Sequence, residues 1–231
     1  MSPQNLPAAI AEVRARIARA AAAAGRSADS VTLLAVSKAQ PPELIDAAAA
    51  AGLKDFGESY LKEALAKIAA LQKRTLTWHF VGRLQANKTR PIAESFAWVH
   101  ALDRLHIAER LAAQRAAGAP PLNVCLQVNL AGEASKGGVA PGELPALARA
   151  VAALPRLALR GLMCLPPEES DPARQRAWFA QLRALFAQVN AAGVRLDTLS
   201  MGMSGDFEAA ILEGATIVRL GTVLFGPRPV Q

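Results

Sequence analysis

The alternation of two kinds of segment along the 231 residues constrains the fold more than any other feature of this sequence. Short apolar runs typical of buried strands lie at Val31–Val36, Leu53–Phe56, Leu76–Val81, Phe96–His100, Leu122–Val128, Leu157–Gly161, Arg195–Leu199 and Thr216–Leu220. Helix-like segments lie between them, at Pro42–Ala51, Ser59–Leu71, Arg104–Ala117, Gly142–Leu154, Pro172–Ala192 and Asp206–Glu213. This alternation predicts parallel strands joined by right-handed crossovers.

Eight apolar runs in a chain of this length favour an α/β fold, a closed (β/α)8 barrel of the TIM type. An open, doubly wound sheet is the alternative. The two folds differ in one neighbour, because only a closed barrel pairs the first strand with the eighth. Apolar residues at helical spacing also predict an extra N-terminal helix over Leu6–Ala24. No linker divides the sequence, so we expect one domain over residues 1–231.

Local chemistry predicts several helix ends. Asp103 and Asp171 stand where N-caps are expected, and Pro172 follows in the first helical position. Gly118 and Gly193 stand just beyond the ends of two helices, where glycine often terminates a helix.

The net charge of +7 and the pI near 10.0 would suit a nucleic-acid partner. The arginines are spread along helices, however, and the densest cluster is only Lys88 with Arg90. We therefore expect no nucleic-acid partner and a solvated surface that attracts small anions. Arginines interrupt the N-terminal alanines and no apolar run is long enough to span a bilayer, which predicts a cytoplasmic protein without membrane contact.

Cysteine and histidine offer no metal site. Cys125 and Cys164 each lie in an apolar run without companion ligands, so we expect buried free thiols. His79 and His100 lie in or at the end of strands, where hydrogen-bonded core imidazoles are expected, and His106 adds no ligand spacing.

Two segments that follow strands can hold an anion. Ser200–Asp206 combines two serine hydroxyls with two glycines, so its backbone N–H groups can approach an anion closely, and Gly221–Thr222 repeats the pattern. The loops after strands seven and eight are the usual phosphate site of this barrel, so the pair predicts phosphate binding. Two ordinary turns with an N-cap at Asp206 are the alternative.

Lys38 follows the first strand and should emerge at the barrel rim, where a lysine is usually a solvated charge. In a closed barrel its amine can point across the mouth toward a ligand whose phosphate lies on the Ser204 and Thr222 loops. An amine that is partly desolvated and near Arg219 would have a lowered pKa and become a nucleophile toward an aldehyde.

Seven ordered motifs extend along nearly the whole chain: LLAVSK (Leu33–Lys38), FGESY (Phe56–Tyr60), WHFVGRLQANK (Trp78–Lys88), QVNLAGEASKGG (Gln127–Gly138), RGLM (Arg160–Met163), LSMGMSGDFEAAI (Leu199–Ile211) and RLGTVLFGPR (Arg219–Arg228). Together they resemble the pyridoxal phosphate homeostasis proteins, the YggS-like family. The resemblance implies the barrel of the N-terminal domain of alanine racemase, with pyridoxal 5′-phosphate (PLP) as its cofactor.

The resemblance also implies the residues that bind PLP: Lys38 through a Schiff base, Ser204, Gly221 and Thr222 at the phosphate, Arg219 facing the pyridine nitrogen, and Met163 and Met203 near the ring or its phosphate. One position departs from the family, which usually has FGEN where this chain has Ser59 after Glu58. A contact from that position to the cofactor is therefore in doubt. Lys136 is a second exposed amine able to capture PLP.

An arginine opposite the pyridine nitrogen disfavours its protonation and weakens the electron sink that PLP catalysis needs. Racemases of related fold add a second domain, whereas this sequence ends directly after the eighth strand. We therefore expect a non-enzymatic monomer or weak dimer that carries and buffers PLP, with apo PLP-dependent enzymes as candidate partners. A PLP-dependent amino-acid racemase, with Tyr60, Lys136 or a partner chain as its base, is the alternative.

Overall fold

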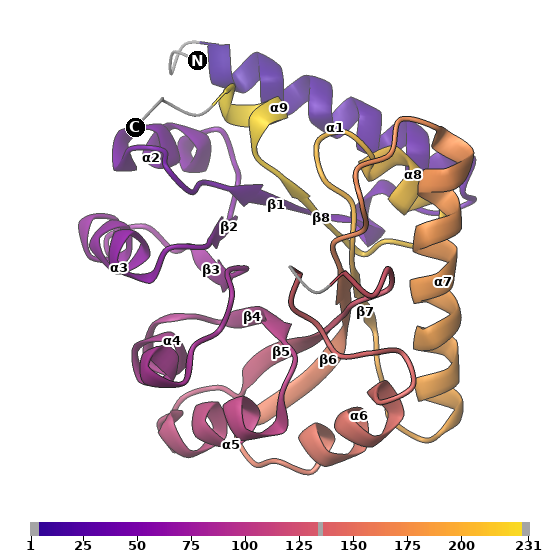
Figure 1. The fold of residues 1–231 in the computed structure, drawn as a ribbon. Helices are drawn as coiled ribbons and strands as arrows, with labels where there is room; N and C mark the ends of the chain where they lie inside the picture. Colours follow the sequence, from indigo (N-terminus) through magenta and orange to yellow (C-terminus); the bar gives the residue numbers. More distant parts are fainter. Residues whose placement is uncertain (1–4, 134–135, 228–231) are drawn as a thin grey trace.

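The computed structural model describes residues 5–133 and 136–227, and its eight strands close into a barrel (Figure 1). The strands are β1 (Thr32–Val36), β2 (Asp55–Glu58), β3 (Thr77–Phe80), β4 (Trp98–Leu102), β5 (Leu122–Val128), β6 (Leu157–Cys164), β7 (Thr198–Ser200) and β8 (Ile217–Leu220). Each pairs in parallel with the next, and β1 pairs with β8, Leu34 opposite Arg219. The closed barrel is confirmed, and the open sheet is excluded.

Helices surround the barrel: α1 (Leu6–Ala23), α2 (Pro42–Ala50), α3 (Leu61–Ala70), α4 (Thr89–Ser95), α5 (Leu105–Gln114), α6 (Leu144–Ala152), α7 (Pro172–Ala191), α8 (Phe207–Leu212) and α9 (Thr222–Phe225), with 3-10 turns η2 (Ala28–Ser30) and η3 (Ala86–Lys88). The extra N-terminal helix is confirmed as α1. It buries Ile10, Val13 and Ile17 and lies beside α8 and α9 (Figure 1).

The prediction that Asp103 caps a helix is wrong, because α5 begins after Arg104. The Asp103 carboxylate accepts a hydrogen bond from the Gly138 N–H (3.3 Å) instead. The same helix ends at Gln114 rather than Ala117. Arg115 leaves the helix with an extended backbone, and its guanidinium donates to three carbonyl oxygens, including that of Ala93 (2.5 Å). These tertiary hydrogen bonds outweigh local helix propensity.

The predicted ends of α7 are confirmed, whereas Gly118 does not terminate a helix, because α5 already ends at Gln114. Asp171 accepts a hydrogen bond from the Ala173 N–H (2.9 Å) at the start of α7, and Gly193 follows the end of α7 with φ +90°. The sequence did not indicate α4, which carries Pro91 in its first turn, or the four-residue α9. Residues 134 and 135 of the fourth motif and Arg228 of the last lie outside the described residues.

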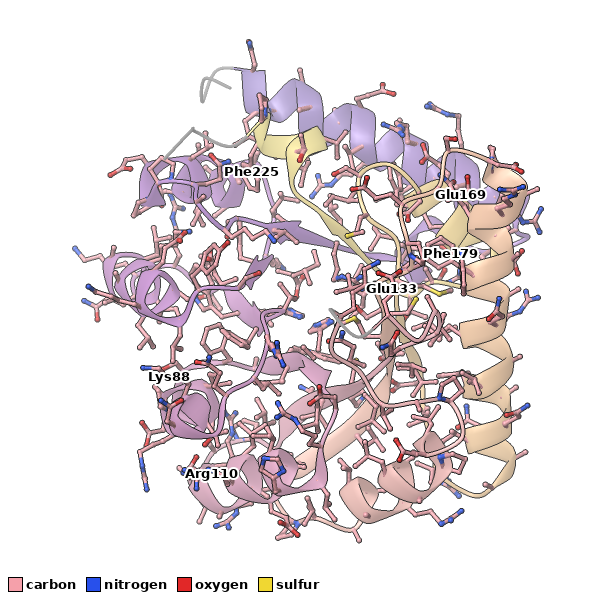
Figure 2. All side chains as sticks on the ribbon, viewed as in Figure 1. Lys88, Arg110, Glu133, Glu169, Phe179 and Phe225 are labelled. Atoms are coloured by element: carbon pink, nitrogen blue, oxygen red, sulfur yellow. The ribbon has the colours of Figure 1, made fainter. Side chains whose placement is uncertain are left out.

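Side chains alternate between two environments along the strands. Trp78 and Phe80 of β3 join the large core shared by strands and helices, whereas His79 between them points to the barrel interior. Arg219 of β8 also points to the barrel interior, and its two neighbours on the strand join the large core. Charged side chains such as Lys88 and Arg110 project from the outer helices (Figure 2). The barrel therefore has an apolar outer layer and a partly polar interior.

Replacement of Gly161 tests the packing of β6 against β7. A Cβ at this position would lie 1.7 Å from the Thr198 carbonyl oxygen. We expect Gly161→Ala to lower the free energy of unfolding by about 3 kcal/mol, because the backbones must separate. Gly118→Ala is the matched control, since its Cβ would meet nothing within 4 Å. Urea denaturation of both variants measures the difference, and equal stabilities would contradict the packing described.

Candidate functional site

A cavity of about 750 Å³ opens at the carboxyl ends of the strands. All seven residues that the sequence associated with a cofactor line it: Lys38, Met163, Met203, Ser204, Arg219, Gly221 and Thr222. Closure of the barrel brings them together, because they follow or end β1, β6, β7 and β8.

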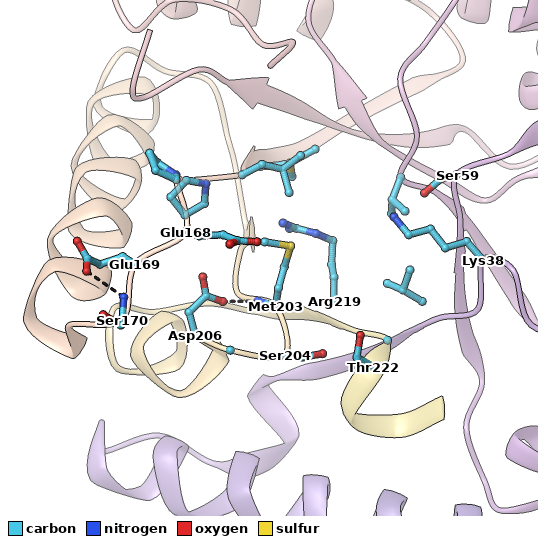
Figure 3. Close-up of a pocket in the computed structure, with 18 of the residues that line it drawn as sticks. Lys38, Ser59, Glu168, Glu169, Ser170, Met203, Ser204, Asp206, Arg219 and Thr222 are labelled. Carbon is cyan, nitrogen blue, oxygen red and sulfur yellow. Dashed lines mark hydrogen bonds between the residues drawn. The ribbon is translucent and has the colours of Figure 1, made fainter. Parts of the chain in front are cut away.

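Lys38 extends into this cavity from the loop after β1 (Figure 3). Its amine is directed toward Arg219 and Met203, while Ser204 and Thr222 lie together along one edge (Figure 3). Glu168 and Asp206 stand on the side away from Lys38. The cavity thus has an amine, a pair of hydroxyls and an acidic side.

The two loops after β7 and β8 meet at the hydroxyl edge. Ser204 Oγ accepts a hydrogen bond from the Val223 N–H (3.4 Å), which links the loops. Gly221 lies close to β1, because a Cβ there would be 3.2 Å from the Val36 carbonyl oxygen. Around Gly205, by contrast, a Cβ would meet nothing within 4 Å. Two hydroxyls beside exposed glycine backbone suit an anionic group.

Asp206 shapes the β7 loop from within. Its Oδ1 accepts a hydrogen bond from the Met203 N–H (2.5 Å), although the side chain does not cap α8 (Figure 3). Burial raises the pKa of the Asp206 carboxyl, against the opposing effects of this hydrogen bond and of Arg219. The loop therefore holds Met203 and Ser204 in place through a side chain on the acidic side of the cavity.

Arg219 forms part of the cavity wall, and its guanidinium is held from below. Nη1 donates to the Ser200 carbonyl oxygen (2.6 Å) and to Ser200 Oγ (2.9 Å), and Nη2 donates to the Cys164 carbonyl oxygen (2.8 Å). Burial lowers the pKa of the guanidinium, which nevertheless remains a cation in a protein. These hydrogen bonds fix a positive charge at the bottom of the cavity.

Two buried histidines continue from Ser200 through the barrel. His100 Nδ1 lies 2.8 Å from Ser200 Oγ, and His100 Nε2 lies 3.0 Å from His79 Nδ1. His79 Nε2 lies 3.1 Å from Asp55 Oδ1. Burial lowers the pKa of His79, and burial together with His79 and Arg219 lowers the pKa of His100 well below 6.5. The expectation of hydrogen-bonded core imidazoles is confirmed.

A buried ionic cluster holds the backbone on both sides of Lys38. Lys67 Nζ donates to the Ser37 carbonyl oxygen and to Glu58 Oε1, both at 2.8 Å, and also to Glu63. The Ala39 N–H donates to Glu63 Oε1 (2.7 Å), and Ala39 adopts φ +62°, which is unusual for alanine.

Glu58 is the most buried member of this cluster. Burial raises the pKa of its carboxyl, against the hydrogen bonds from Lys67 and the Ser37 hydroxyl, and Oε2 has no partner among the described residues. The cluster therefore stabilises the one backbone conformation that directs Lys38 into the cavity.

Neither this cluster nor the histidine contacts were among the features predicted from the sequence. One signal was available: Lys67 lies on the buried face of α3 together with Ala64, and a charged residue on an apolar face requires a partner. The histidine contacts gave no such signal, because they join side chains on different strands.

Two further residues considered in the sequence lie elsewhere. Tyr60 is exposed, and the Lys136 amine donates to Glu133 Oε1 and to the Pro166 carbonyl oxygen; neither residue lines the cavity. Ser59 does line it, beside Lys38 (Figure 3). Cys125 and Cys164 are buried and unpaired as expected, and burial raises the pKa of each thiol to about 12.

Over residues 5–133 and 136–227, no three histidine, cysteine or acidic side chains gather as metal ligands. None of the helices described there combines the length and apolar character needed to cross a membrane.

Comparison with known proteins agrees with this architecture. The family model of the alanine racemase N-terminal domain matches residues 9–229. The pyridoxal phosphate homeostasis protein of Pseudomonas aeruginosa is 62% identical over 219 residues, which are 95% of this chain and 94% of that protein. The pyridoxal phosphate homeostasis protein of Escherichia coli is 50% identical over 222 residues, 95% of each.

A solved structure of PipY from Synechococcus elongatus, with PLP bound, is 41% identical and superposes with a TM-score of 0.81. The match covers 91% of this chain and 100% of that one. The chain therefore belongs to the alanine racemase N-terminal domain family and, within it, to the pyridoxal phosphate homeostasis proteins.

The buried imidazoles predict a pH dependence of stability. The folded pKa of His100 is lower than the unfolded value of 6.5, so the unfolded chain binds the proton more readily. Neutral His100 therefore contributes fully to the free energy of unfolding above pH 6.5, and this contribution is lost as the pH falls toward the folded pKa. Below pH 6.5 the free energy of unfolding of the wild type should fall by up to about 1.4 kcal/mol per pH unit more than that of His100→Gln. Urea denaturation between about pH 7 and pH 5.5 measures both slopes, and identical slopes would contradict a neutral His100.

Proposed function

We propose that the chain binds PLP covalently and reversibly on Lys38, and that as a single domain it carries and buffers the cofactor for apo-enzymes. One observation carries this proposal: the Lys38 amine and the hydroxyls of Ser204 and Thr222 line the same cavity. The names of the relatives and the PLP in PipY support the choice of ligand.

The residues of the cavity fit the chemistry of PLP. When bound, PLP supplies a phosphate, an aromatic ring and an aldehyde, which condenses with a primary amine and releases water. Ser204 and Thr222 would donate their hydroxyl hydrogens to the phosphate, with backbone N–H groups beside Gly221. Lys38 would supply the amine, and Met163 and Met203 would pack near the ring.

The side chains that line the cavity favour a carrier over an enzyme. Arg219 would face the ring nitrogen, and a fixed cation there disfavours the protonated ring on which carbanion chemistry depends. Tyr60 and Lys136, the candidate bases for a racemase, are not among the described residues that line the cavity. Lys38 and Arg219 would then hold the cofactor without completing a catalytic site.

A PLP-dependent amino-acid racemase is the alternative, and a direct assay separates the two functions. The PLP-loaded chain is incubated with single enantiomers of amino acids, and optical rotation is followed. A carrier leaves the rotation constant over many equivalents of amino acid. Steady loss of rotation that requires Lys38 would reject the carrier function while leaving PLP binding intact.

Borohydride reduction tests the attachment site, because it makes the bond between a lysine and PLP permanent. We expect peptide mass analysis to find reduced PLP on Lys38 of the wild-type chain. Lys38→Met should lose the label, since methionine keeps the length of the side chain but has no amine. Lys136→Arg is the matched control and should keep it. A label on Lys136 in the wild type, or none, would reject the assignment.

The phosphate contacts predict a selective loss of affinity. Ser204→Ala combined with Thr222→Val removes two hydroxyls, and we expect the affinity for PLP to fall about a hundredfold or more, as for the loss of two hydrogen bonds to a charged group. Pyridoxal, which lacks the phosphate, should bind the variant and the wild type alike. Fluorescence titration with both ligands measures this. An equal loss for pyridoxal would show damage to the cavity rather than to the phosphate contacts.

A further inference from the structure

A continuous series of hydrogen-bonded groups passes through the barrel interior from the cavity to the opposite end. It consists of Arg219, Ser200, His100, His79 and Asp55, with successive distances of 2.9, 2.8, 3.0 and 3.1 Å. Arg219 lines the cavity, whereas Asp55 is the first residue of β2 and lies at the amino end of the barrel. We call these five residues the interior chain.

The direction of each hydrogen bond follows from the two ends. The Asp55 carboxylate can only accept, so His79 must carry its hydrogen on Nε2. Burial lowers the pKa of both imidazoles, so each is neutral at pH 7, and a neutral imidazole has one donor and one acceptor nitrogen. His79 Nδ1 is therefore an acceptor, and the hydrogen between the rings belongs to His100 Nε2.

The hydrogen-bond directions from His100 to the cavity follow from this tautomer. With its hydrogen on Nε2, His100 accepts at Nδ1, so the Ser200 hydroxyl donates to it. A lone pair of Ser200 Oγ then accepts from Arg219 Nη1, which can only donate. All four hydrogen bonds run the same way, from the guanidinium to the carboxylate. Hydrogen bonds aligned in this way polarise and strengthen one another.

Without the Asp55 carboxylate, the direction of the hydrogen bonds along the interior chain would no longer be fixed. His79 and His100 could then adopt the opposite tautomers, in which His100 donates to Ser200. The Ser200 hydroxyl would lose the acceptor that His100 provides and would be a weaker acceptor for Arg219. The two carbonyl contacts of Arg219 would persist. The guanidinium would therefore stay in place but be held less firmly.

We propose that Asp55 is a positioning residue for the cofactor cavity, which acts from the opposite end of the barrel by fixing the hydrogen-bond direction that orients Arg219. This inference rests on the proposed function, because Arg219 affects PLP only if PLP occupies the cavity. The other four residues of the interior chain would then affect how the ligand is held without touching it.

The test compares two leucine variants in the full chain. Asp55→Leu removes the acceptor and resists its replacement by water. Asp197→Leu is the matched control, because Asp197 directly precedes β7 at the same amino end of the barrel but pairs with Arg160, outside the interior chain. Asp55→Glu keeps a carboxylate, which can only accept, and should preserve the wild-type direction. Thermal unfolding confirms that each variant is folded.

Two readouts apply. Nitrogen NMR should find the hydrogen on Nε2 of both histidines in the wild type and in Asp55→Glu, and altered tautomers in Asp55→Leu. PLP affinity should fall about threefold to tenfold in Asp55→Leu, the effect of one hydrogen bond, with a shift in the absorption of bound PLP. Asp55→Glu and Asp197→Leu should stay within about twofold of the wild type.

The outcomes distinguish this inference from the proposed function. If the wild type binds PLP but Asp55→Leu matches Asp197→Leu in affinity and absorption, the positioning role is wrong and the carrier function stands. Wild-type histidines with the opposite tautomers would also overturn it. If the wild type binds no PLP, the proposed function fails first and this inference fails with it.

Discussion

The hydrogen bonding of β1 to β8 is the constraint on which the rest of the structure depends. In this register Leu34 lies opposite Arg219 and Ala35 opposite Leu220, so the loop that carries Lys38 emerges beside the loop that carries Thr222. Residues from the two ends of the chain thereby share one cavity. An open sheet would leave β1 and β8 as separate edges or distant strands, and the amine and the hydroxyls would not meet.

Buried polar groups fix the positions of the residues around the cavity. Arg219, Lys67 and Glu58 are all buried, and each has hydrogen-bond partners that offset the cost of removing it from water. The Lys67 cluster holds the backbone around Lys38 from one side, and Ser200 and Cys164 hold Arg219 from below. The cavity is therefore shaped by residues that do not line it, which is how rigid ligand sites are usually supported.

Much of the fold could be predicted from the sequence, because apolar runs and helical stripes are local patterns. The predicted strands correspond to β1–β8, and the N-cap at Asp171 follows local chemistry. Errors arose where a distant partner competes for a local group. Asp103 binds the Gly138 loop instead of capping α5, and Arg115 leaves the helix to bind carbonyls from other segments. No nearby residue indicates either contact.

The features of the candidate site also fall into two groups, those encoded in local sequence and those set by tertiary contacts. Strand ends, glycines and family motifs are properties of the sequence, and by themselves they determined the family and seven of the residues that line the cavity. Only the tertiary structure decided barrel closure, the cluster around Lys67 and the alignment of His79, His100 and Ser200. The physical reason is that these contacts join side chains on different elements. Their distances depend on strand register and barrel curvature, which no spacing within a single segment encodes.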